Sequence, residues 1–198
     1  MLRNILFSLS NKLPCRLIDH EGKPYLERHL LGTVFGTRIY LHRFVASDPA
    51  GVHDHPFERA FSFIVAGWYF EDRWGQRRKK QWFNTIGPND FHRVVLPNNG
   101  KDVWTIFFHS PRVKPWGFLR VTSQVDNGSV LEYVPESSKE DPAFSDWSKD
   151  LCGREVRAAQ SHPIAPGNNA YSQGLLAYPN EDIHFVRQNL KPSVESSI

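Results

Sequence analysis

Gly51-Val52-His53-Asp54-His55-Pro56 is the stretch that decides the fold, together with the later stretch Gly87-Pro88-Asn89-Asp90-Phe91-His92. Side chains alternate between the two faces of an extended strand, so His53 and His55 point the same way. His92 opens a later strand-like run and can complete a set of three imidazoles. Three converging ring nitrogens can hold a divalent metal and leave coordination positions open. The pattern therefore predicts a metal site.

Short β-prone runs surround these two stretches, and turn residues separate them. We expect a hairpin around Glu21-Gly22, and then strands over residues 38–45, 60–70, 81–86, 92–96, 103–109 and 116–121. Asn98-Asn99-Gly100 predicts a hairpin between the strands that flank it. Short strands separated by turns, at intervals of about 8–12 residues, are typical of an all-β barrel or sandwich.

The two ends of the chain differ from this middle part. Residues 1–14 predict an amphipathic helix that ends at Pro14, and one helix is expected within 141–160. From about residue 123 the strand pattern dissolves. We predict one barrel domain over 1–122, with the N-terminal helix and hairpin, and an irregular extension over 123–198 that packs on the barrel without forming an independent domain.

Composition excludes several classes of function. The chain has 198 residues, a net charge of +3, 40% hydrophobic and 13% aromatic residues, so it can bury a core and has no strong field for nucleic acid or membrane. Its basic turn at residues 73–80 is interpreted as a solvated edge. The longest apolar stretch is too short to span a bilayer. Cys15 and Cys152 are isolated, which suits a reducing cytoplasm.

Two motifs carry a resemblance to a known family. Gly51-x-His-x-His-Pro, Gly67 and the stretch from Gly87 to His92 resemble the sequence motifs of the cupin superfamily, over roughly residues 38–121. The resemblance implies a double-stranded β-helix (jelly-roll) barrel. It also implies that His53, His55 and His92 bind a metal, most often iron. The longer pattern is similar to a functionally undefined group of bacterial and phage cupins.

One position departs from the family pattern. The usual cupin has a metal-binding Glu four or five residues after the second histidine, where this chain has Arg59 or Ala60. Glu58 is a fourth candidate ligand if Pro56 introduces a bulge that re-aims it. Without Glu58 the site resembles the three-histidine cupins, among them thiol dioxygenases. Three neutral histidines would leave Fe(II) with a net charge of +2, suited to an anionic substrate; Zn, Ni and Mn are alternatives.

Three further residues are candidates for catalysis. Arg112, at the barrel mouth, can clamp a carboxylate, and its alternative is a solvated loop arginine. Arg43 lies in an apolar strand where an anion would explain it; either Arg43 or His42 faces the cavity, because they point to opposite faces. His109 can act as a base or donor beside the metal, or be a satisfied core histidine.

These features favour a mononuclear non-haem iron oxygenase of the cupin type, acting on a small anionic metabolite. One alternative is a non-enzymatic ligand-binding or structural cupin, perhaps phage-encoded, whose metal stabilises the barrel. Another is a metal-dependent isomerase or lyase. A homodimer is compatible with the sequence, which has no interface signature.

Overall fold

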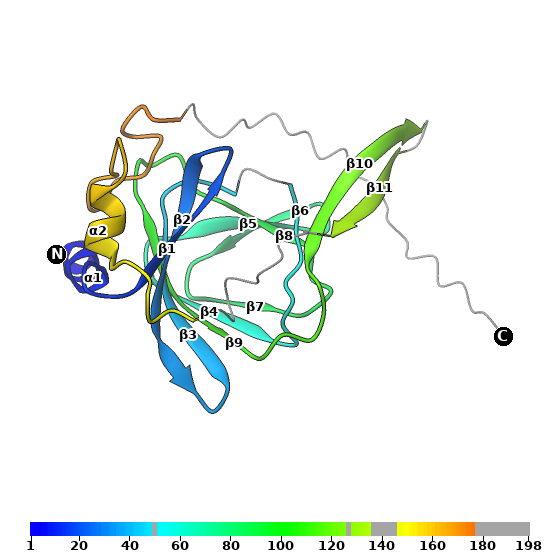
Figure 1. Cartoon of the computed structure of the whole chain (residues 1–198). Helices are drawn as coiled ribbons and strands as arrows, with labels where there is room; N and C mark the ends of the chain where they lie inside the picture. Colours follow the sequence, from blue (N-terminus) through cyan, green and yellow to red (C-terminus); the bar gives the residue numbers. More distant parts are fainter. Residues whose placement is uncertain (49–50, 126–127, 136–145, 177–198) are drawn as a thin grey trace.

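A six-stranded antiparallel β-sheet faces two smaller antiparallel sheets, and a cluster of buried aromatic side chains lies between them (Figure 1). The structure, a computed structural model, describes residues 1–48, 51–125, 128–135 and 146–176. Strands dominate these residues and two short helices lie on the outside of the barrel. The predicted all-β class is confirmed.

The larger sheet has six strands in the order β1-β2-β3-β9-β4-β7. Their bounds are β1 Cys15–His20, β2 Lys23–Val34, β3 Thr37–Phe44, β9 Val103–His109, β4 Ala60–Ala66 and β7 Phe83–Ile86. The turn between β1 and β2 uses Glu21 and Gly22, both with positive φ (54° and 74°). This is the hairpin that the sequence predicted.

The opposite side of the barrel contains two smaller groups of strands. Their bounds are β6 Gln76–Lys80, β5 Tyr69–Arg73 and β8 His92–Val95 in one group, and β10 Gly117–Val125 and β11 Gly128–Pro135 in the other. The stretch that contains His53 lies between the groups, because His53 forms a β-bridge with His92 on one side and with Phe118 on the other. The predicted metal-binding stretch therefore connects the two groups of strands on this side of the barrel.

Four sequence predictions about strands need correction. The expected single strand over 60–70 is two strands, β4 and β5, in different sheets. Gly67 separates them with a φ of +92°, where a side chain would be strained and would approach Asp102 O at 3.2 Å. The hairpin at Asn98-Asn99-Gly100 was wrong, because β8 pairs with β5 while β9 pairs with β3 and β4. The basic residues 76–80, expected as a turn, form β6, an edge strand. Strand β11 lies where an irregular extension was expected.

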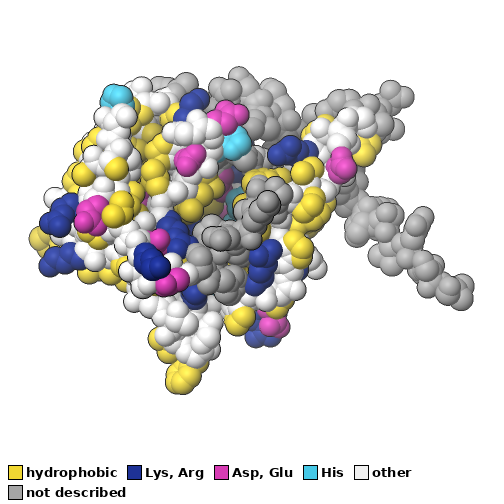
Figure 2. All heavy atoms as spheres, viewed as in Figure 1, with side chains coloured by type: hydrophobic (Ala, Val, Ile, Leu, Met, Phe, Trp, Pro, Cys, Tyr) yellow, Lys and Arg dark blue, Asp and Glu magenta, His cyan; other side chains and the backbone are white. Residues whose placement is uncertain are grey.

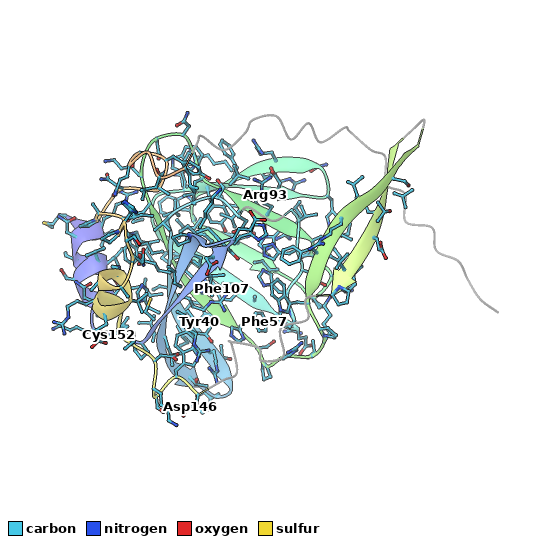
Figure 3. All side chains as sticks on the ribbon, turned by 45° about the horizontal axis from the view of Figure 1, so that its top comes forward. Tyr40, Phe57, Arg93, Phe107, Asp146 and Cys152 are labelled. Atoms are coloured by element: carbon cyan, nitrogen blue, oxygen red, sulfur yellow. The ribbon has the colours of Figure 1, made fainter. Side chains whose placement is uncertain are left out.

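Tyr40, Phe57 and Phe107 pack together inside the barrel (Figure 3). They come from β3, β9 and the loop after the His-rich stretch, and face inward because alternate residues of β3 and β9 do so. Trp147, from the C-terminal extension, joins this cluster and lies 5.5 Å from the Tyr40 ring. The extension thus contributes to the core of the barrel.

A buried ionic network covers the outer face of the six-stranded sheet. Arg43 donates to Glu27 (3.0 Å) and Asp102 (2.9 Å), and also to the carbonyl oxygens of Ile164 and Ala165. Arg157 donates to the same Glu27 carboxylate. Burial alone would raise the pKa of Glu27, but its hydrogen bond to His29 and the charges of Arg43 and Arg157 hold that pKa well below its usual range.

This network connects helix α1 and the described part of the C-terminal extension to the barrel. Helix α1 (Leu2–Ser10) places Leu6 against β3 and β9 and Phe7 beneath the Arg157 guanidinium, 4.1 Å away. Helix α2 (Gly153–Ala158) carries Arg157 itself. The helix expected within 141–160 is therefore present and shorter, and residues 141–145 lie outside the described residues. That 123–198 is not an independent domain stays a prediction, and the contacts of residues 146–176 agree with it.

Substituting Arg43 tests how much the network stabilises the fold. We expect Arg43→Met to lower the free energy of unfolding by about 3–5 kcal/mol, because Glu27 and Asp102 stay buried after losing a hydrogen-bonded partner. Urea denaturation measures this change. Arg120→Met, at an exposed position of β10, is the matched control and should shift stability by less than about 0.5 kcal/mol. A cost for Arg43→Met no larger than that of the control would contradict this account.

Candidate metal centre

The stretch from Gly51 to Pro56 is held in an extended form by hydrogen bonds on both sides. His53 N donates to His92 O, and His92 N donates to His53 O, both at 2.9 Å. On the other side, Asp54 N donates to Gly117 O. Two residues that exchange both backbone bonds lie directly opposite each other. This pairing places the His53 and His92 side chains next to each other.

The side chain of Asp54 points away from the histidines and fixes the stretch from behind. Its carboxylate accepts hydrogen bonds from Gly117 N (2.7 Å) and from Lys114 Nζ (2.5 Å), and it is fully buried. His53 and His55, one residue to either side, face the interior of the barrel. The alternation predicted from the sequence is confirmed.

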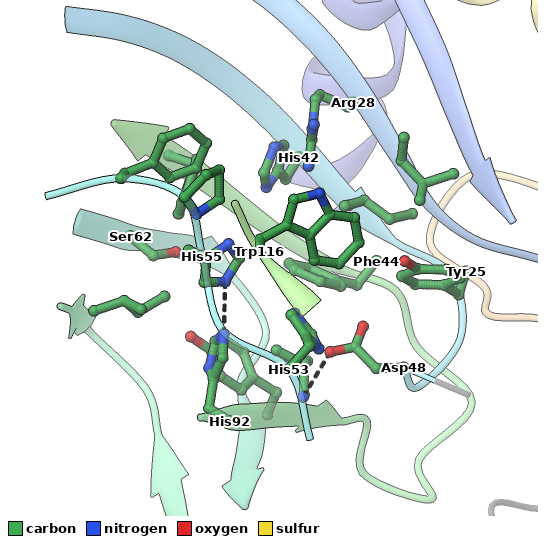
Figure 4. A pocket seen from close by; sticks show the side chains of 18 residues that line it. Tyr25, Arg28, His42, Phe44, Asp48, His53, His55, Ser62, His92 and Trp116 are labelled. Carbon is green, nitrogen blue, oxygen red and sulfur yellow. Dashed lines mark hydrogen bonds between the residues drawn. The ribbon is translucent and has the colours of Figure 1, made fainter. Parts of the chain in front are cut away.

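Three imidazole rings meet at one point of the inner wall (Figure 4). The ring centroids of His53, His55 and His92 lie 5.0–5.2 Å from one another. Each ring offers one nitrogen, and these nitrogens all lie within 4.8 Å of one another. The shortest separation is 2.8 Å, between the Nε2 atoms of His55 and His92. Rings from stretches far apart in the sequence thus form one cluster.

Glu71 of β5 orients the third histidine. Its Oε1 lies 2.9 Å from His92 Nδ1, so Nδ1–H donates to the carboxylate and the Nε2 lone pair faces His55. Asn84 (2.6 Å) and Arg73 (2.7 Å) donate to the same oxygen, and Lys80 pairs with the other oxygen at 3.2 Å. A carboxylate behind a histidine fixes the tautomer of a metal ligand in the same way.

Burial keeps two of the rings neutral. It lowers the pKa of His53 to about 3, with a further lowering by the nearby His92, while a hydrogen bond to the Gly51 backbone acts in the opposite direction. Burial, followed by the same neighbour, also holds the pKa of His55 well below its usual range. A neutral imidazole has the free lone pair that metal coordination requires.

The spacing of His55 Nε2 and His92 Nε2 matches that of two ligands of one metal ion. Ligand nitrogens that lie about 2.0–2.1 Å from a metal and at right angles to each other stand about 2.9 Å apart. The 2.8 Å separation of the two Nε2 atoms matches that edge closely. Within the described part of the chain, the group consists of the three histidines alone, with no carboxylate. Three protein ligands would leave positions for other molecules.

A cavity of about 160 Å³ lies beside the three rings. Its wall is mostly apolar and aromatic, and it includes side chains from both sheets. The lining residues used below are Arg28, His42, Phe44, Asp48, Phe107 and Trp116. A largely apolar pocket with a few converging polar groups is the usual form of a small-molecule site.

The structure places the predicted fourth ligand outside the cluster. Glu58 is exposed, and the three-histidine group does not include it. Pro56 and Phe57 turn inward and line the cavity, so the next side chain in the sequence faces solvent. Glu58 as a metal ligand is not supported by this geometry.

The three predicted catalytic residues also lie away from the cavity lining. Arg112 is exposed, and its Nε donates to Lys114 O. Arg43 belongs to the outer network, so of the two alternatives on β3 it is His42 that faces the cavity. His109 is buried at 3.7 Å from the Phe57 ring, with Nδ1 donating to Ser110 O, behind the wall. Roles for these three residues stay predictions.

Sequence reasoning missed Glu71 and Arg28, which the fold brings to the histidines and to the cavity wall. A charged residue in an otherwise apolar run was the available signal for Glu71, since Trp68-Tyr69-Phe70 precedes it directly. For Arg28 the strand had been recognised only as one half of a hairpin. Which face of that hairpin is inside depends on the pairing of β2 with β3.

Comparison with known proteins gives a likeness in fold. No protein-family model and no curated protein sequence matches the chain. A solved cupin-2 domain protein from Shewanella frigidimarina is 12% identical with a TM-score of 0.40, and the match covers 55% of this chain and 91% of that one. The facing antiparallel sheets and the three converging histidines agree with the β-barrel expected from the sequence.

Two other similar structures have different chemistry in their names. A structure of DMSP lyases (RdDddP and RnDddQII) is 12% identical with a TM-score of 0.47, and the match covers 56% of this chain and 63% of that one. FeII HppE is 11% identical with a TM-score of 0.41, covering 49% and 56%. The chain thus spans less than two thirds of both proteins.

The described residues contain no helix long and apolar enough to cross a membrane.

Glu71→Gln tests the orientation of His92. We expect this variant to bind Zn(II) or Fe(II) about 10–100-fold more weakly, because the amide no longer fixes the His92 tautomer as a carboxylate does. Competition with a chromophoric chelator measures the affinity. Glu58→Gln is the matched control and should bind metal as the unmodified protein does. A loss confined to Glu58→Gln would restore Glu58 as a ligand and contradict the assigned geometry.

Proposed function

We propose that the protein is a metal-dependent cupin enzyme, in which His53, His55 and His92 hold a divalent metal and the adjacent cavity takes a small substrate. In its more specific form, the proposal is a mononuclear non-haem Fe(II) oxygenase acting on a small anionic metabolite. The observation that carries it is the convergence of three imidazole nitrogens at the wall of a cavity.

The ligand set is compatible with iron and favours an anionic substrate. Imidazole nitrogens suit Fe, Zn, Ni and Cu, and availability in the cell decides among them. With three neutral ligands the site would keep the full charge of a divalent ion, which attracts an anion. When bound, such an ion supplies a Lewis acid, and iron adds redox chemistry with dioxygen.

The protein contributes orientation and a dry environment. Glu71 holds the Nδ1 proton of His92, so the Nε2 lone pair stays directed into the cavity. Phe44, Phe107 and Trp116 form the apolar part of the wall and limit the access of water. Exclusion of water strengthens electrostatic interactions inside a site and protects reactive species from side reactions.

Oxygen uptake tests the proposal. Protein loaded anaerobically with Fe(II) should bind close to one equivalent of metal and consume dioxygen when a small carboxylic acid from a panel of candidates is added. His53→Ala should lose both properties, because two imidazoles hold iron much more weakly than three. Zn(II)-loaded protein is the control, and it should not consume dioxygen.

The outcomes separate the candidate functions. Substrate conversion without oxygen uptake would replace the oxygenase with a lyase or isomerase that uses the metal as a Lewis acid. Failure of the unmodified protein to bind any divalent metal, with its fold intact by circular dichroism, would contradict the metal enzyme altogether.

A further inference from the structure

Two polar side chains lie next to each other on the cavity wall contributed by the larger sheet. Arg28 of β2 and His42 of β3 are direct cross-strand partners, and both line the cavity with the three histidines (Figure 4). Directly opposed residues of neighbouring strands have their side chains on the same face. The rest of this wall is mostly apolar, so the pair provides a polar patch.

His42 has an unused hydrogen-bonding atom. Its Nε2 is buried without a hydrogen-bond partner among the described residues, and the whole residue is only 4% exposed. Phe107 stacks on the ring at 4.9 Å and Tyr40 at 5.8 Å, which fixes its plane. A buried polar atom without a partner costs free energy, and a bound ligand can supply the partner.

Arg28 supplies positive charge to the same space. Its guanidinium lies 5.5 Å from the Tyr40 ring centroid, which supports it on one side. Its charge adds to burial in lowering the pKa of His42. Asp48 also lines the cavity, but burial raises its pKa and its carboxylate accepts a hydrogen bond from Val94 N. Arg28 therefore offers a positive charge to an anion bound in the cavity.

The size of the cavity limits the ligand. A cavity of about 150 Å³ accommodates benzene, which has six non-hydrogen atoms. The volume here is about 160 Å³. A group of about five to seven non-hydrogen atoms fits within this volume.

We propose that Arg28 and His42 form the substrate-recognition end of this cavity, with Arg28 binding the carboxylate of a small organic acid and His42 Nε2 bonding a hydroxyl on its carbon chain. A small hydroxy acid would then be the substrate class of the proposed enzyme, and only the reaction, not the binding, rests on the proposed function. The binding itself requires no metal. Arg28, which faces the cavity, would therefore bind the anion in place of Arg112 or Arg43, the residues that the sequence suggested.

Four small molecules of nearly equal size separate the two contacts. Lactate and lactamide differ in charge, and lactate and propanoate differ in a hydroxyl group; 3-hydroxypropanoate covers a hydroxyl one carbon further along. Chemical-shift titration of ¹⁵N-labelled protein, with the indole N–H of Trp116 as a cavity probe, gives each affinity. We expect the unmodified protein to prefer lactate over lactamide at least tenfold, and one of the hydroxy acids over propanoate at least threefold.

The variants should remove one preference each. Arg28→Met should abolish the preference for the acid over the amide, and Arg28→Lys should retain part of it. His42→Leu should abolish the preference for the hydroxy acid and keep the preference for charge, and His42→Gln should restore part of the former. Arg120→Gln is the matched control on the outside of the barrel and should change neither. Thermal unfolding of each variant establishes that it is folded.

The possible results distinguish this inference from the proposed function. Equal binding of lactate and lactamide by the unmodified protein, or an Arg28→Met protein that is folded and keeps the preference, would overturn the inference. Zn(II) titration of the same samples tests the metal site independently. Loss of metal binding in His92→Ala with the lactate preference intact would leave the recognition end standing.

Discussion

The paired backbone hydrogen bonds between His53 and His92 are the constraint on which the rest of the site depends. They attach the His-rich stretch to β8, and the bonds from Asp54 and Leu119 on its other edge attach it to β10. Because backbone pairing fixes which residues are opposite, the metal-binding geometry follows from the register of the sheet. A slip of one residue would turn both histidines to the outer face, where Asp54 now accepts its hydrogen bonds.

The two faces of the larger sheet have separate tasks. On β3, Tyr40, His42 and Phe44 face inward, while Leu41 and Arg43 face the outer layer formed by α1 and the extension. Figure 2 shows a third environment, the tip of the β2–β3 hairpin, where Val34 and Phe35 are exposed. Because Arg43 forms its ion pairs with Glu27 and Asp102 on the outer face, these ion pairs are separate from Arg28, the charge on the inner face that a ligand would meet. This separation lets the cavity remain largely apolar around a few polar groups.

Local features of the sequence were predicted well, and features that depend on strand order were not. Alternation of side chains along a strand is enough to predict that His53 and His55 face the same way and that a strand contains Arg43. Turn chemistry is enough to predict the turn at Glu21-Gly22. The role of Arg43 needed knowledge of Glu27 and Asp102, distant in sequence, and its awkward position in an apolar strand is explained by them. The sequence did not predict strand β11, although Val130, Tyr133 and Val134 are typical strand residues. The polar and charged residues around them favoured an irregular segment.

Charge balance explains why a carboxylate can orient the site without opposing an anionic ligand. Glu71 is buried, and burial alone would raise its pKa, but its hydrogen bonds with His92, Asn84 and Arg73 keep that pKa low. Arg73 and Lys80 compensate its negative charge on the side away from the cavity. His53 and His55 remain neutral, and among the described lining residues Arg28 is the cation that faces the cavity. In the recognition end that we propose, a positive charge with little water to screen it would favour anions over neutral molecules of the same shape.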